Sequence, residues 1–174
     1  MTGAVIRAVP CRIGPVRMTK NTFEVRVLRS GDTPTLRAML SMFGRAFGEA
    51  ATYTARQPDD EYLGRLLSTD TFIALAAVSG GKVIGGIAAY VLPKFEQARS
   101  ELYLYDLAVD EPCRRQGVAT AMIAELQNIA VERGAYVIFV QADFADEAAI
   151  ALYTKLGTRE DVLHFDIAPT KSAA

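Results

Sequence analysis

Residues 101–120 constrain the fold of this chain more than any other segment. Glu101–Val109 is an apolar run that predicts a buried strand, and Gly117 begins an amphipathic helical pattern shortly after it. The first N–H groups of a helix have no partner within the helix, and a glycine lets the backbone approach a ligand closely. Arginines in such a turn add charge-assisted hydrogen bonds to phosphate oxygens. We therefore predict a pyrophosphate-binding loop made of Arg114, Arg115, Gln116, Gly117, Val118, Ala119 and Thr120.

Length and composition indicate a single globular domain. The chain has 174 residues, of which 51% are hydrophobic and 22% are charged. No apolar run approaches the length of a membrane span, so we expect a cytoplasmic protein without a membrane partner. Cys11 and Cys113 give no disulfide framework. A catalytic thiol at Cys113 would need a nearby His or Asn pattern, which the sequence lacks.

The net charge of −1 conceals an uneven distribution. Residues 1–22 carry four of the 19 basic residues and none of the 20 acidic residues. We predict that residues 1–22 form a basic, loosely ordered extension and that residues 23–174 form the single domain. The acidic body argues against a nucleic-acid partner and favours a small cationic substrate.

Apolar periodicity predicts a β-α-α-β-β-β-α-β-α-β order of elements. A helix beginning near Asp32 and a second one spanning Asp59–Leu67 are separated by a loop at 53–58. Ser79–Lys82 indicates a hairpin turn, and Gly85-Gly86 indicates a bulge or bend. The expected strands are Phe23–Arg29, Thr71–Val78, Val83–Leu92, Glu101–Val109, Tyr136–Ala142 and Val162–Ile167, and the later helices are 118–133 and Asp146–Leu156.

Two motifs in this order resemble the GNAT superfamily of N-acetyltransferases. They are Arg114-x-x-Gly117-x-Ala119 and the helix Ala149–Gly157, which reads Ala-Ile-Ala-Leu-Tyr-Thr-Lys-Leu-Gly. The resemblance implies an α/β (α+β) fold, with a mixed twisted sheet of six to seven strands and about four flanking helices. It also implies that the fourth and fifth strands splay apart around acetyl-CoA.

The resemblance further implies which groups hold the cosubstrate besides the phosphate loop. Main-chain groups of Leu107, Ala108 and Val109 would pair with pantetheine like an added strand. Asp146 stands where the family commonly has Asn, and it still suits a helix cap. Tyr153 would lie beside the sulfur of CoA.

Several further segments resemble the gentamicin 3-N-acetyltransferases within this superfamily. They are Phe43–Phe47, Thr71–Ala77, Ala89–Pro93, Tyr105–Val109, Tyr136–Asp143 and His164–Ile167. This closer resemblance implies a homodimer that acetylates the 3-amino group of an aminoglycoside.

The residues favour direct attack of an amine on the thioester. No Ser-His-Asp order is apparent, and the single His164 cannot form a His-rich metal site, so we expect no metal. A phenol with a pKa near 10 stays protonated at neutral pH and can donate to a leaving thiolate. Tyr153 is therefore the predicted general acid.

Asp106 is the carboxylate that stands out in an apolar strand. Because a buried carboxylate is costly without a partner, either a bound cationic amine or an internal donor must pair with it. We predict that it anchors the substrate and accepts its proton. A wider acidic cleft would also include Asp59, Asp60, Asp143, Glu147, Glu160 and Asp161.

Two other interpretations remain open at this point. The acidic cleft would equally serve a polyamine or protein amine acetyltransferase. A CoA-binding module without turnover would use the same loop and could retain Tyr153.

Overall fold

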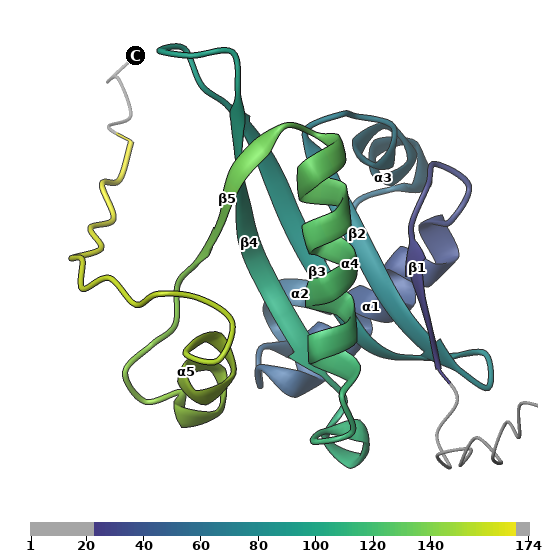
Figure 1. The fold of residues 1–174 in the computed structure, drawn as a ribbon. Helices are drawn as coiled ribbons and strands as arrows, with labels where there is room; N and C mark the ends of the chain where they lie inside the picture. The colour runs from purple at the N-terminus through teal and green to yellow at the C-terminus, as the bar shows by residue number, and fades with distance from the viewer. Residues whose placement is uncertain (1–22, 170–174) are drawn as a thin grey trace, which may run out of the picture.

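The computed structural model describes residues 23–169, so the predicted extension at 1–22 lies outside the described residues. The elements follow one another as in Figure 1. They are β1 (Glu24–Val27), α1 (Thr33–Ala46), α2 (Ala50–Thr54), α3 (Asp60–Leu67), β2 (Phe72–Ser79), β3 (Lys82–Pro93), β4 (Ser100–Val109), the short 3-10 helix η1 (Glu111–Cys113), α4 (Val118–Glu132), β5 (Ala135–Val140) and α5 (Glu147–Tyr153).

The sheet is mixed and its strands follow chain order, β1-β2-β3-β4-β5. β1 to β4 are antiparallel to their neighbours, and β5 lies parallel to β4 after the crossover through α4. This confirms the α/β GNAT fold class with its central mixed sheet. The described residues contain five strands rather than six to seven.

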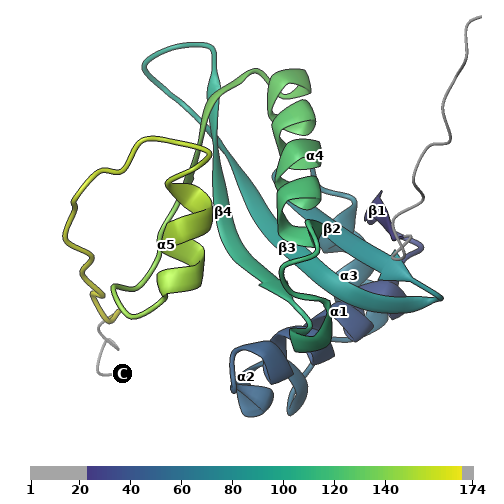
Figure 2. The same cartoon turned by 60° about the horizontal axis from the view of Figure 1, so that its bottom comes forward.

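Helices cover the two faces of the sheet separately, as Figures 1 and 2 show. α4 packs on one face through the predicted apolar stripe of Val118, Met122, Leu126 and Ile129. α1 and α3 pack on the opposite face. Asp60 of α3 pairs with Arg37 of α1 at 2.8 Å, which ties these two helices together.

Gly85 and Gly86 in β3 let both helical layers approach the sheet. A Cβ on Gly85 would lie 3.0 Å from side-chain atoms of Val118 and Met122 on α4, and one on Gly86 would lie 2.5 Å from Met39 on α1. The bulge expected here is present in β3 beside the glycine pair, because Ala77 pairs with Gly85 and Val78 with Val83, which leaves Ile84 as the extra residue. The glycine pair therefore serves close helix packing.

The predicted strand at Val162–Ile167 is wrong for the described chain. No helix or strand spans residues 158–169. Alternating apolar residues give a segment the propensity for a strand, but a strand also needs an edge with which to pair. Without that partner the apolar side chains stay in solvent: Val162, Leu163, Phe165 and Ile167 are 70–91% exposed.

The loop predicted at 53–58 is also partly wrong, since α2 extends to Thr54. Ala50 and Ala51 favour a helix there because alanine loses no side-chain entropy on forming one. α5 ends at Tyr153, earlier than the predicted Leu156. Within residues 23–169, no helix has the length and apolar character needed to cross a membrane.

We predict that Gly86→Ala destabilises the domain by about 1–3 kcal/mol because the new methyl group would overlap Met39 between β3 and α1. Gly31→Ala is the matched control, because a Cβ there meets nothing within 4 Å. Urea unfolding of both variants measures the difference. Equal stabilities would contradict the close packing of α1 on β3.

Candidate active site

The candidate site begins where β4 and β5 part. Their parallel ladder runs from Ser100 and Ala135 to Leu104 and Val140 and then stops. β4 continues to Val109 with only β3 beside it, and the two strands diverge in Figure 1. The Asp110 amide bonds Ile84 on β3, so the main-chain groups of Ala108, two residues earlier, also face β3, and those of Leu107 and Val109 lie on the outer edge. An extended chain with amide groups fits such an edge as an added strand does.

The predicted phosphate loop follows β4 directly. Gly117 is the N-cap of α4 with a φ of +83°, and a Cβ built on it meets nothing within 4 Å. Arg115 also has a positive φ of 61°. Arg114 donates from Nε to the Val109 carbonyl at 3.1 Å, which fastens the loop to the end of β4. The open space above Gly117 and the free N–H groups of α4 fit a pyrophosphate.

Tyr153 lies at the end of α5, half-buried against the core cluster that also receives Leu107 and Ala119. Burial, with Asp146 as a second cause, raises the pKa of the Tyr153 phenol to about 12. Asp146 caps α5 by accepting a hydrogen bond from the Ala149 amide at 2.9 Å. The hydroxyl therefore stays protonated at neutral pH, as a general acid requires.

A β-bulge shapes the strand at Asp106. Ala88 pairs with Asp106 while Ala89 pairs with Leu104, so Tyr105 has no partner on β3. The extra residue shifts the alternation of side chains. Ala108 packs in the α1 layer and Leu107 packs against the α4 layer, which places Asp106 on the α1 face.

The structure supplies an internal partner for Asp106 that sequence analysis missed. The Tyr53 hydroxyl on α2 donates to Asp106 Oδ1 at 3.2 Å. Burial raises the pKa of Asp106, the Tyr53 hydrogen bond opposes that rise, and the nearby charge of Glu49 adds to it. The partner is neutral, so the carboxylate can still pair with a cation.

Tyr53 and Glu49 were missed because the sequence pattern predicted no helix between Gly48 and Asp59 and placed Tyr53 in a loop. The spacing of Glu49 and Tyr53, four residues apart, could have indicated one helical face. Burial and the adjacent Asp106 raise the pKa of Tyr53. Together the three residues form an acidic, hydroxyl-lined patch at the α1 face of β4.

The other predicted acidic residues lie in different parts of the structure. Asp59 caps α3 through the Tyr62 amide at 2.8 Å, and Asp60 is engaged by Arg37. Asp161 pairs with Arg159 at 2.6 Å. Asp143, Glu147 and Glu160 are exposed on the β5–α5 side of the molecule. Glu49 thus lies near Asp106, whereas Asp59, Asp60 and Asp161 interact with other residues of the chain.

His164 and Cys113 lie outside the proposed chemistry. His164 Nδ1 is 3.2 Å from Gln141 Nε2, and its Nε2 is 3.1 Å from Asp166 Oδ1. Cys113 is half-buried against the α4 layer.

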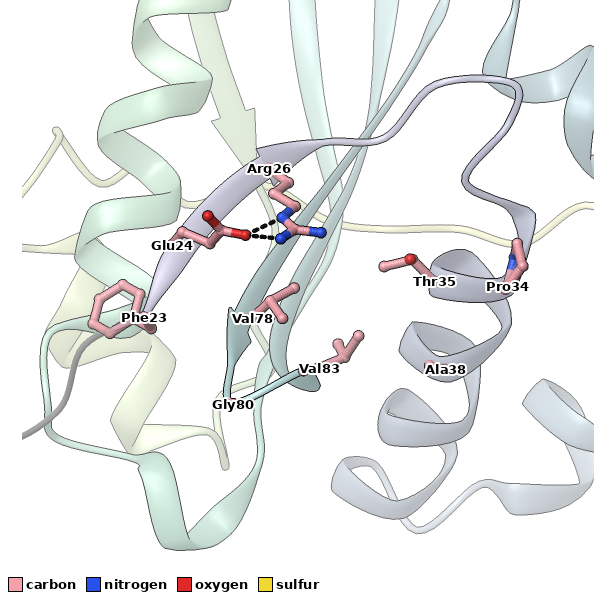
Figure 3. A pocket seen from close by; sticks show the side chains of 10 residues that line it. Phe23, Glu24, Arg26, Pro34, Thr35, Ala38, Val78, Gly80 and Val83 are labelled. Atoms are coloured by element: carbon pink, nitrogen blue, oxygen red, sulfur yellow. Dashed lines mark hydrogen bonds and ion pairs between the residues drawn. The ribbon is translucent and has the colours of Figure 1, made fainter.

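An open groove of about 570 Å³ lies elsewhere, between β1, the β2–β3 turn and α1 (Figure 3). Glu24 and Arg26 form an ion pair at its wall. Its lining residues include none of the predicted site residues. We therefore place the candidate active site at the divergence of β4 and β5 and not in this groove.

Comparison with solved structures gives two aminoglycoside acetyltransferases from uncultured soil metagenomic samples. The first is 52% identical with a TM-score of 0.84, over 86% of this chain and 99% of that one. The second, in complex with sisomicin, is 29% identical with a TM-score of 0.78, over 85% and 97% of the two chains.

Curated relatives are more distant. Mouse N-acetyltransferase 8F1 is 27% identical over 123 residues, which are 64% of this chain and 55% of the mouse protein. The [ribosomal protein bS18]-alanine N-acetyltransferase of Escherichia coli (strain K12) is 30% identical over 49% of this chain and 57% of its own length. The chain spans about half the length of the curated relatives it matches.

The model of the acetyltransferase (GNAT) family matches residues 36–158, well over half of the chain. That range contains the phosphate loop, the divergent strands and Tyr153. The chain belongs to the GNAT acetyltransferase family.

Proposed function

We propose that the protein transfers the acetyl group of acetyl-CoA to the 3-amino group of an aminoglycoside such as gentamicin. The observation that carries the substrate class is the similarity to an aminoglycoside acetyltransferase, at 52% identity across 86% of the chain. The uncompensated carboxylate of Asp106, with Glu49 nearby, supports a cationic acceptor. The 3-position rests on the resemblance of the segments described above.

Acetyl-CoA would supply the thioester whose acetyl group is transferred. The amides from Gln116 to Thr120 and the side chains of Arg114 and Arg115 would hold its pyrophosphate. The edge of β4 at Leu107–Val109 would pair with its pantetheine, since β5 leaves that edge unpaired. Tyr153 would donate a proton to the departing sulfur.

Asp106 would orient the acceptor and receive its proton. Burial makes this carboxylate a stronger base than an exposed aspartate, because its raised pKa lies above the usual value of 3.8. The Tyr53 hydroxyl holds one oxygen and leaves the other for the amine.

A panel of acceptors tests the proposed function directly. Thiol release from acetyl-CoA is measured with gentamicin, spermidine and a basic peptide, and mass spectrometry and NMR locate the acetyl group on the product. Efficient turnover of spermidine or of the peptide, with no acetylated gentamicin, would replace the proposal with the polyamine or protein alternative. Turnover with no acceptor would indicate a CoA-binding module.

We predict that Tyr153→Phe lowers kcat by about a hundredfold or more, because the phenol can no longer protonate the leaving thiolate. The ring still packs in the core cluster, so the KM for acetyl-CoA should change little. Tyr136→Phe is the control, since it removes a hydroxyl that bonds Glu101 at the start of β5. A normal kcat for Tyr153→Phe would leave Tyr153 with a packing role alone.

We predict that Asp106→Asn lowers kcat/KM for the aminoglycoside far more than it changes acetyl-CoA binding. If Asp106 accepts the proton, kcat falls by about a hundredfold. If Asp106 only anchors the amine, the change appears in KM. Unchanged values of both constants would move the substrate site elsewhere.

The dependence of kcat/KM on pH tests the role of Asp106 independently. The ionised carboxylate is the active form, so kcat/KM falls as the pH drops through the raised pKa of Asp106. Tyr53→Phe removes the hydrogen bond that opposes the rise of that pKa. The low-pH limb should therefore move to higher pH in Tyr53→Phe and disappear in Asp106→Asn.

We also propose a homodimer. The 70–91% exposure of Val162, Leu163, Phe165 and Ile167 supports it, because a contiguous apolar segment of this size is costly in water. Sedimentation equilibrium measures the mass, and the mass of a single chain at micromolar concentration would exclude the dimer.

A further inference from the structure

Four aromatic residues form one straight row across the sheet. Phe72 is the register partner of Tyr90, Tyr90 of Tyr103, and Tyr103 of Phe139. We call these four residues the aromatic row. It spans β2, β3, β4 and β5 on the α1 face of the sheet, because Phe72 packs in the α1 layer.

Ring contacts hold the row and Tyr105 in a fixed arrangement. Tyr103 stacks on Phe139 with ring centroids 4.8 Å apart and planes 4° apart. The ring of Tyr105 lies edge-on to Tyr90 at 5.7 Å and to Tyr103 at 5.5 Å. Such edge-on pairs are favourable geometries, so the side chains are ordered before any ligand arrives.

The row is covered by helices only in part. Phe72 packs in the α1 layer, whereas none of α1, α2 and α3 lies behind β5 in Figure 1. Tyr105 is 59% exposed although β4 is an interior strand, and Phe139 is 36% exposed. The bulge at Tyr105 turns this side chain to the same face as Asp106.

The charged groups beside the aromatic row indicate which kind of ligand fits it. Asp106 lies beside the middle of the row, since its register partner Ala88 is two residues from Tyr90 on β3, and the Tyr53 hydroxyl and Glu49 are near it. Burial, with the charge of Asp106 as a smaller cause, raises the pKa of Tyr90 and of Tyr103. The surface thus combines aromatic faces, tyrosine hydroxyls, the half-buried carboxylate of Asp106 and the exposed carboxylate of Glu49. Ammonium groups are attracted both to aromatic faces and to carboxylates.

We propose that Tyr105 and the aromatic row bind the sugar rings of the acceptor, so that the site selects a polyhydroxylated ring bearing ammonium groups over a linear polyamine. Carbon-bound hydrogens of a ring would cover the aromatic faces. Hydroxyl groups of the ring would bond the tyrosine hydroxyls, and an amine would reach Asp106. A linear polyamine has ammonium groups for the carboxylates but no ring that would cover the aromatic faces and no hydroxyl groups for the tyrosine hydroxyls. This inference rests on the proposed function and deepens it.

The test compares three variants with two acceptors. Tyr105→Leu removes the ring, Tyr105→Phe retains it, and Phe95→Leu removes a fully exposed aromatic ring from the β3–β4 turn. Tyr105→Leu should raise the KM for gentamicin about tenfold while changing kcat little. Tyr105→Phe should return that KM to within about threefold of the wild-type value. The KM for acetyl-CoA and any KM for spermidine should stay unchanged in Tyr105→Leu.

Several outcomes would overturn the inference. An unchanged KM for gentamicin in Tyr105→Leu excludes binding of the sugar rings by Tyr105 and the aromatic row. An equal loss with gentamicin and spermidine shows that Tyr105 does not distinguish a sugar ring from a linear polyamine. A change of mass by sedimentation without a change of KM shows that a second copy covers this face.

Failure of the proposed function would look different. In that case the wild-type protein acetylates no aminoglycoside, whatever happens at Tyr105. Calorimetric binding of gentamicin to the CoA-saturated protein then still tests binding by Tyr105 and the aromatic row, because Tyr105→Leu should weaken binding about tenfold and Tyr105→Phe should not. No gentamicin binding by the wild-type protein would overturn the inference as well.

Discussion

The candidate active site depends on the point at which the hydrogen-bond ladder between β4 and β5 ends. A parallel pair satisfies both strands as long as they stay together, and here the pairing stops at Leu104 and Val140 while β4 continues to Val109. Main-chain groups on that edge then need another partner, because unpaired backbone groups away from water are costly. A pantetheine chain with its amides is one such partner. The same divergence leaves room for α5, which brings Tyr153 against the cluster that contains Leu107.

A single extra residue in β4 brings an aromatic side chain and the carboxylate of Asp106 to the same face of the sheet. Regular alternation would place Tyr105 and Asp106 on opposite faces of the sheet. The bulge instead leaves Tyr105 without a partner and directs it to the face of Tyr90 and Tyr103. The carboxylate and the aromatic surface therefore adjoin, and α2 completes the arrangement through Tyr53.

Local signals in the sequence predicted most of the fold, including the loop and helix at which we expect the cosubstrate. The helical stripe from Val118 and the glycine at 117 are properties of neighbouring residues, and the structure has both. The partners of Asp106 depend instead on a contact between residues 53 positions apart. The aromatic row depends on strand register, which periodicity alone does not supply. The strand at 162–167 failed for a related reason, since propensity does not decide whether a segment pairs with an edge, and in the described chain this segment pairs with none.

The two exposed apolar surfaces, which are the aromatic row and residues 158–169, differ in whether their backbone is paired in the sheet. The aromatic row belongs to paired strands, so its backbone is satisfied and only its side chains face solvent. A small molecule suffices to cover such a surface. Residues 158–169 belong to no helix or strand, so both their backbone and their apolar side chains lack a regular partner. Another strand would satisfy both needs at once, because it supplies N–H and C=O groups together with apolar contacts. This difference is why we propose the acceptor for the face of the sheet and a second copy of the chain for the C-terminal segment.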